Sequence, residues 1–109
     1  MAERIITKIA NISSPSFSYI QKEIIKALTG TSLGHGIPRL NIRILIKVNR
    51  EIKSGHPEKL PARTTVYDNL KKLEKREYVG RTDTKIGHSR GRPNAYWFLT
   101  RKGRMIENM

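Results

Sequence analysis

The sequence predicts an α+β fold that is mainly helical and ends in a two- or three-stranded β-wing. Residues 63–76 carry apolar side chains at helical spacing, with a basic opposite side. After this helix the pattern changes, because residues 78–82 and 96–99 are short runs rich in aromatic and β-branched side chains. Residues 87–94 between them combine turn-forming residues with arginines. A helix followed by a two-stranded ribbon with a basic tip is the outline of a winged helix-turn-helix.

A chain of 109 residues is most simply one domain, which we place at residues 15–109. Residues 1–14 precede it as an N-terminal arm or a short helix. Their isoleucines would line one face of a helix, and they suit an arm that packs on a partner subunit equally well. These isoleucines are Ile5, Ile6, Ile9 and Ile12.

Residues 15–29 are predicted to form the first core helix. Ser14 suits its N-cap and Pro15 its first turn, where a missing N–H is harmless. Thr29 and Gly30 suit its end. We interpret it as a packing helix, on the apolar positions Phe17, Ile20, Ile24, Ile25 and Leu28.

A short first strand is predicted within residues 37–40, and Asn41 is a suitable N-cap for the next element. Residues 41–54 fit a strand or a helix by apolar spacing alone. Their length and their helix-favouring charged residues favour the helix. Gly55 and Pro57 would end it.

Residues 58–62 then form the turn of the helix-turn-helix, longer than the usual three or four residues. The following helix enters after Pro61 without an evident side-chain cap. Its apolar stripe consists of Val66, Leu70 and Leu73. Thr100 closes the second wing strand and can cap a last short helix.

The formal net charge is +13 and the sequence pI is about 10.5. This excess predicts a polyanionic partner, with nucleic acid first and an acidic membrane surface second. The absence of cysteine excludes disulfides and thiolate metal sites, and it fits a cytoplasmic protein. No apolar run is long enough to span a membrane, so we expect no membrane-spanning segment and take nucleic acid, not a membrane, as the partner.

The predicted helix at 63–76 fits the major groove of DNA, where base edges show distinct donor and acceptor patterns. Thr64 and Thr65 near its start can bind phosphate, helped by the positive end of the helix dipole. Lys71, Lys72 and Lys75 can neutralise phosphates along the groove. These residues are therefore predicted DNA contacts.

Tyr67 can bind phosphate through its hydroxyl or contact a thymine methyl with its ring. Asp68 is unexpected on such a face. It could accept a hydrogen bond from a cytosine amine, or it could pair with Lys71 or Lys72 one turn later; the pairing is the simpler alternative.

Arg90 and Arg92 flank Gly91 at the predicted wing tip. A narrow minor groove has the most negative potential, so these arginines can enter it or bind phosphates. In the second wing strand, Tyr96 and Phe98 should face one side and Trp97 the other. Trp97 could stack on a base, but packing under the wing is the simpler interpretation.

Catalysis has little support in the sequence, and we expect no enzyme activity and no cofactor. The three histidines lie far apart without metal-ligand spacing, and the nine acidic residues are scattered. No Gly-rich phosphate loop or nucleophile elbow is present. No small-molecule ligand can be identified.

Three segments resemble known winged-helix regulators. The recognition helix of archaeal and bacterial winged-helix regulators, with its T-V-Y-x-x-L-x-x-L-E pattern, resembles the segment LPARTTVYDNLKKLEKREYV. EIKSGHPEKLPARTTVYDNL resembles the second helix and turn of ferric-uptake-regulator-type domains, and GRPNAYWFLTRKGR is similar to the wing of PadR- and MarR-like proteins. The resemblance implies a groove-facing helix bearing Arg63, Thr64, Thr65, Tyr67, Asp68, Lys71 and Lys72, and a wing tip bearing Arg90 and Arg92.

The predicted function is therefore sequence-specific binding of double-stranded DNA, as a transcription regulator and a homodimer. Such families usually dimerise through a long C-terminal helix, which this sequence lacks after Arg104. We therefore expect the interface at residues 1–12 or at the first core helix. The alternatives are an assembly module of a replication or transcription complex, and a nonspecific nucleic-acid coating protein.

Overall fold

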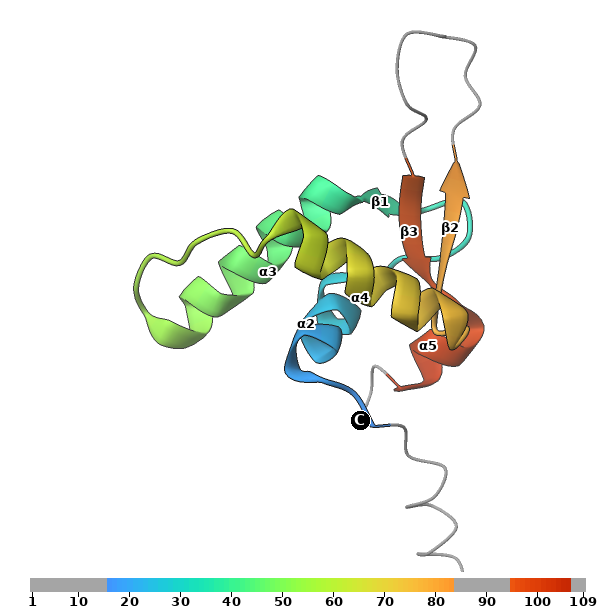
Figure 1. Cartoon of the computed structure of the whole chain (residues 1–109), viewed down its shortest axis with the longest axis horizontal. Coiled ribbons are helices and arrows are strands. Elements are labelled where there is room, and N and C mark those ends of the chain that lie inside the picture. The colour runs from blue at the N-terminus through green and yellow to red at the C-terminus, as the bar shows by residue number, and fades with distance from the viewer. Residues whose placement is uncertain (1–15, 84–94, 107–109) are drawn as a thin grey trace, which may run out of the picture.

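The computed structural model describes residues 16–83 and 95–106. Within these residues, four helices pack with a three-stranded antiparallel sheet of order β1-β3-β2, which confirms the predicted α+β winged-helix class (Figure 1). None of these helices is both long and apolar enough to cross a bilayer. The elements are α2 (Tyr19–Ala27), β1 (Ile37–Pro38), α3 (Arg39–Ser54), α4 (Arg63–Lys75), β2 (Val79–Asp83), β3 (Ala95–Leu99) and α5 (Arg101–Ile106).

Helix α2 begins at Tyr19, four residues later than predicted. Ser18 is the N-cap, because its hydroxyl accepts from the Gln21 N–H (3.3 Å) while the Gln21 side chain accepts from the Ser18 N–H (3.1 Å). This reciprocal capping box satisfies two otherwise unpaired donors and sets the start of the helix. The predicted cap Ser14 and first-turn Pro15 lie outside the described residues.

Helix α3 confirms the choice of helix over strand, but it begins at Arg39 and not at Asn41. Pro38 is its N-cap, with φ −70° and ψ 159°, and it makes no side-chain capping bond. Pro38 also pairs with Tyr96 in the sheet, so the chain passes directly from β1 into the helix. Asn41 therefore lies in the first turn. Gly55 ends the helix in the left-handed conformation (φ 79°), as its position predicts.

Both faces of strand β3 are covered, which modifies the predicted alternation. Trp97 is 1% exposed and packs under the wing, as the simpler interpretation predicted. Phe98 points the other way and is nevertheless buried. Its ring lies over Gly80 on β2, where an added Cβ would stand 2.6 Å from the ring. Because Gly80 has no side chain, the Phe98 ring can occupy this position.

The core is formed where α2, α3 and α4 meet the sheet (Figure 1). Val66, Leu70 and Leu73 are each fully buried, so the predicted stripe of α4 is confirmed. The buried Thr31 joins the connection after α2 to β3, because its hydroxyl donates to the Leu28 carbonyl (2.5 Å) and accepts from the Leu99 N–H (2.9 Å). The packing holds α4 beside β2 and β3 and leaves its other side exposed.

A bidentate ion pair fixes α3 to α2. Arg50 donates to both oxygens of Glu23, at 2.6 and 2.7 Å. The guanidinium and carboxylate geometries match, which makes this kind of pair stronger than a single contact. The hydrogen bonds to Glu23 raise the pKa of Arg50 above its ordinary value, because they stabilise the charged guanidinium.

Candidate nucleic-acid interface

The exposed side of α4 carries most of the residues predicted to contact DNA. Thr64, Thr65, Asp68, Lys71, Lys72 and Lys75 are all exposed on α4. The buried apolar stripe holds the helix by its opposite side. Among the described residues no side chain caps the start of α4, since its N-cap is Ala62. Its first N–H groups therefore remain available to an anion, and the helix dipole favours one there.

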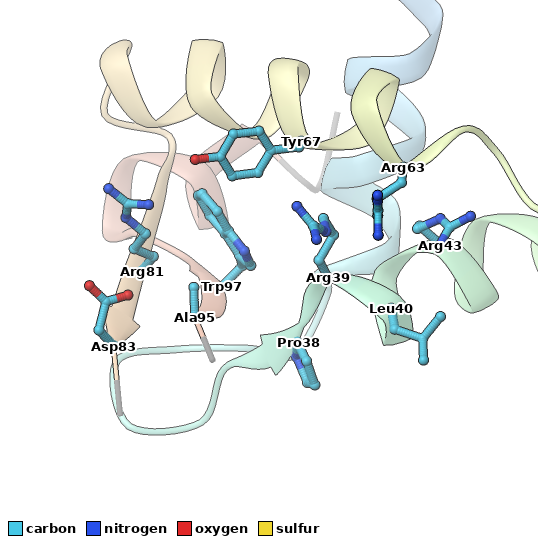
Figure 2. A pocket seen from close by; sticks show the side chains of 10 residues that line it. All are labelled: Pro38, Arg39, Leu40, Arg43, Arg63, Tyr67, Arg81, Asp83, Ala95 and Trp97. Carbon is cyan, nitrogen blue, oxygen red and sulfur yellow. The ribbon is translucent and has the colours of Figure 1, made fainter. Parts of the chain in front are cut away.

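A cleft of about 810 Å³ opens next to this surface, between the starts of α3 and α4 and the strands of the wing (Figure 2). Four arginines line it, and we call it the arginine cleft. Arg39 and Arg43 come from α3, Arg63 from α4 and Arg81 from β2. Since each guanidinium offers several donors in a fixed planar fork, the cleft is a concentrated site for phosphate or carboxylate oxygens.

Two aromatic rings form the floor of the arginine cleft. Tyr67 packs edge-on against Trp97, with 6.3 Å between ring centroids and 83° between planes. The Arg39 guanidinium lies 5.3 Å from the Tyr67 ring centroid, and Arg81 lies 5.5 Å from that of Trp97. Figure 2 shows the Tyr67 ring between α4 and Trp97, with its hydroxyl directed to the β2 side. Cation–π contacts of this kind hold the arginines without neutralising them.

Helix ends and a loop contact add to this arrangement. The starts of α3 and α4 both lie at the cleft, and neither has a side-chain cap among the described residues. Arg43 donates through Nε to the Pro61 carbonyl (3.0 Å), which attaches α3 to the turn before α4. The other guanidinium nitrogens of Arg43 can still donate to a ligand.

Acidic side chains moderate the positive charge on the wing side. Glu74 lies 3.3 Å from Arg81 Nε and 3.5 Å from Lys71 Nζ, so it links α4 to β2. Asp83 also lines the arginine cleft. Lys71 therefore pairs with Glu74, and no ion pair from Asp68 to Lys71 or Lys72 occurs among the described residues. Asp68 remains exposed on α4.

The predicted site residues thus fall into three groups. Arg63 and Tyr67 line the arginine cleft, whereas the other predicted residues of α4 lie on its exposed side. Arg90 and Arg92 lie outside the described residues. In the parts of the chain that the structure describes, no group of three His, Asp or Glu side chains could hold a metal ion.

Arg39, Arg43 and Arg81 were not predicted from the sequence as site residues. Placing the start of α3 at Asn41 put Arg39 in the preceding strand and hid its position in the first turn of a helix. For Arg81 the available signal was alternation, because it pairs with Trp97 across the wing, and Trp97 was expected under the wing. No local pattern indicates that α3 and β2 face each other across α4.

No protein-family model matches the sequence, and no curated protein matches it significantly. Among solved structures, the fold is similar to the crystal structure of a PadR family transcription regulator from Clostridium difficile R20291. The TM-score is 0.56 at 18% sequence identity, and the match covers 84% of this chain and 81% of that chain.

The fold is a winged helix. In this winged helix α3 and α4 form the helix-turn-helix, and β2 and β3 form the stem of the wing. The resemblance to winged-helix regulators expected from the sequence is confirmed at the level of the fold. The arginine cleft lies between the starts of these two helices and the strands of the wing.

Proposed function

We propose that this protein is a non-enzymatic transcription regulator that binds double-stranded DNA at specific sequences. One observation carries the proposal: four arginines from three separate elements converge on a cleft beside the exposed side of α4. Arginine binds phosphate bidentately, and a winged helix presents its recognition helix to the major groove. A net charge of +13 supplies the long-range attraction to a polyanion.

In this proposal α4 enters the major groove with its exposed side. Thr64 and Thr65 bind phosphate at the start of the helix, and Asp68 and Tyr67 contact bases or adjacent phosphates. The lysines at positions 71, 72 and 75 neutralise phosphates along the groove. Within the described residues, two of these side chains have contacts of their own. Tyr67 packs against Trp97, and Lys71 lies near Glu74 on the same helix.

The arginine cleft receives the sugar-phosphate backbone next to the groove. Its four guanidiniums project from rigid elements, and the two aromatic rings orient Arg39 and Arg81. The starts of two helices add positive potential at the same place. Arg90 and Arg92, between the two wing strands in sequence, are proposed to extend this surface to the minor groove or to further phosphates.

Binding to selected and to bulk DNA tests the proposal. The preferred site is first selected from random double-stranded DNA, and isotherms are then measured over a salt series. The double variant Arg39→Ala/Arg81→Ala should flatten the slope of log affinity against log salt by about two. The single variant Arg101→Ala, an exposed arginine on α5, serves as control and should retain the wild-type slope.

Each outcome separates the proposal from its alternatives. A slope unchanged in the double variant would show that the arginine cleft does not contact DNA. Equal affinity of the wild type for selected and bulk DNA would indicate a nonspecific coating protein. Failure to bind either DNA would favour an assembly module of a replication or transcription complex.

We also propose that the protein acts in the cytoplasm. We propose a homodimer because one winged helix reads only a short DNA site and two-fold pairing extends it. The division into residues 1–14 and a domain of residues 15–109 stays a proposal. Of the two interfaces expected from sequence, residues 1–12 lie outside the described residues. The apolar side of α2 is engaged in the core, with Ile24 and Ile25 buried, so α2 offers little apolar surface to a partner.

A further inference from the structure

Helix α3 has a second apolar side that stays exposed among the residues that the structure describes. Leu40, Ile44, Val48 and Ile52 follow one another at steps of four residues and are between 39% and 76% exposed. Leu45 lies beside them and is 38% exposed. We call these five residues the α3 stripe. Because α3 is already anchored by the fully buried Ile42 and Ile46 on its other side, the stripe is not part of the core.

The stripe is about the size of the largest apolar patch on a typical monomer, and such patches are often functional. Five large aliphatic side chains at these exposures amount to roughly 400 Å² of apolar surface, and contiguous patches of this size commonly mark interaction sites. The C-terminal half of α3 extends away from the body of the domain, as Figure 1 shows, so the stripe is accessible to another molecule.

We propose that the α3 stripe binds a second copy of this chain, with the two α3 helices antiparallel and the two-fold axis close to Val48. In this arrangement Val48 faces its own equivalent, and Ile44 of each copy faces Ile52 of the other, as a two-fold interface requires. Two such surfaces bury roughly 800–1,000 Å² in total, which is below the standard size of a specific interface and in the range of weak, transient ones. The dimer is therefore expected to be weak and reversible.

The charges around the stripe fit a second copy. Lys47 and Glu51 lie next to it and pair within the helix, at 2.8 Å between Nζ and Oε2. In the antiparallel arrangement each Lys47 lies between its own Glu51 and Glu51 of the second copy. The other two cations of this half of the helix are engaged elsewhere, Arg50 with Glu23 and Lys53 over the Tyr19 ring. The charged side chains along this half of α3 are thus engaged within the domain by ion pairs or, for Lys53, by a cation–π contact that leaves its charge in place.

The position of the stripe connects this dimer to DNA. Leu40, at one end of the stripe, also lines the arginine cleft together with Arg39 and Arg43. Pairing of two α3 helices therefore holds two arginine clefts in one fixed relation. This consequence rests on the proposed DNA binding. The dimer, whose interface is assigned here, does not require DNA and is tested without it.

Disulfide cross-linking provides a direct test, because the full chain contains no cysteine. Under mild oxidation Val48→Cys should give a covalent dimer, since residues on a two-fold axis bring their Cα atoms within disulfide range. A mixture of Ile44→Cys and Ile52→Cys should cross-link more than either variant alone. Leu33→Cys, 72% exposed in the connection before β1, is the control and should form no covalent dimer on the same time scale.

Sedimentation over about 1–300 μM protein gives an independent test. The wild type should shift from monomer to dimer, Val48→Asp should stay monomeric, and Leu33→Asp should behave like the wild type. Circular dichroism and melting temperature confirm that both variants are folded. The charge variants Lys47→Glu and Glu51→Lys should each weaken the dimer, and mixing them should restore it.

Three results would overturn the proposal. In the first, the wild type stays monomeric over the whole concentration range and the thiol of Val48→Cys reacts freely with a thiol reagent. This combination would assign the α3 stripe to a different partner. A monomeric Val48→Cys variant whose introduced thiol is protected from the reagent would indicate that another segment of the same chain covers the stripe. A dimer that survives Val48→Asp would place the interface elsewhere.

Discussion

Tyr67 lies where the exposed side of α4 meets the arginine cleft. The sequence predicted a DNA contact, and the structure adds a packing role, because the ring contacts Trp97 and carries Arg39 over its face. Removing the whole side chain would therefore disturb both stability and binding. A variant that keeps the ring and removes only the hydroxyl separates the two roles.

We expect Tyr67→Phe to change the free energy of unfolding by less than about 0.5 kcal/mol, because the ring contacts remain. Its affinity for the selected DNA site should fall about five- to tenfold, as for one lost hydrogen bond. Tyr67→Ala should in addition destabilise the domain by about 1–3 kcal/mol. Chemical denaturation and binding isotherms measure both. An equal loss on bulk DNA in Tyr67→Phe would identify a phosphate contact, and unchanged affinity would exclude a contact by the hydroxyl.

At the scale of elements, the two helices that flank the site begin differently from α2. A complete capping box starts α2, whereas α3 and α4 begin at the cleft without side-chain caps from the described residues. Unpaired N–H groups at a helix start cost stability and also form an anion site. We therefore expect that the uncapped N–H groups at the start of α4 lower the stability of the helix and bind phosphate in the proposed complex.

The variant Ala62→Ser tests this exchange. Its hydroxyl should accept from an N–H in the first turn of α4 and raise the free energy of unfolding by about 1 kcal/mol. The same N–H would then be lost to phosphate, so the slope of log affinity against log salt should fall by up to about one. Ser18→Ala at the cap of α2 is the matched control, with stability lowered by about 1 kcal/mol and the slope unchanged. An Ala62→Ser variant that is stabilised but binds as before would show that phosphate does not use the start of α4.

At the scale of the whole molecule, the charge distribution is expected to set the dependence on salt. Changing Arg90 and Arg92 to alanine together should flatten the salt slope by about two at most and leave the melting temperature unchanged. If these arginines enter a narrow minor groove, the loss of affinity should be larger on sites with A·T-rich flanks. Isotherms with A·T-rich and G·C-rich flanks over a salt series measure this. Equal losses on both flanks would leave the arginines as phosphate contacts only, and no loss would exclude them from the interface.

Several features follow from the sequence alone because they depend on neighbours along the chain. Helical spacing located α4 within one residue and identified its buried stripe, since a period of 3.6 residues is a local property. Aromatic and β-branched runs located the wing strands, and Gly55 marked the end of α3. The fold class and the candidate helix were therefore predictable.

Other features depend on contacts between distant segments, and only the tertiary structure decided them. Arg39 and Arg81 are 42 positions apart in sequence and reach one cleft only because α3 and β2 pack on opposite sides of the α4 start. The same packing selected Ile42 and Ile46 for the core and left Ile44 and Val48 exposed, although all four alternate in one apolar run. The apolar pattern specifies that α3 buries a side, but the neighbouring helices determine which side is buried and which remains exposed.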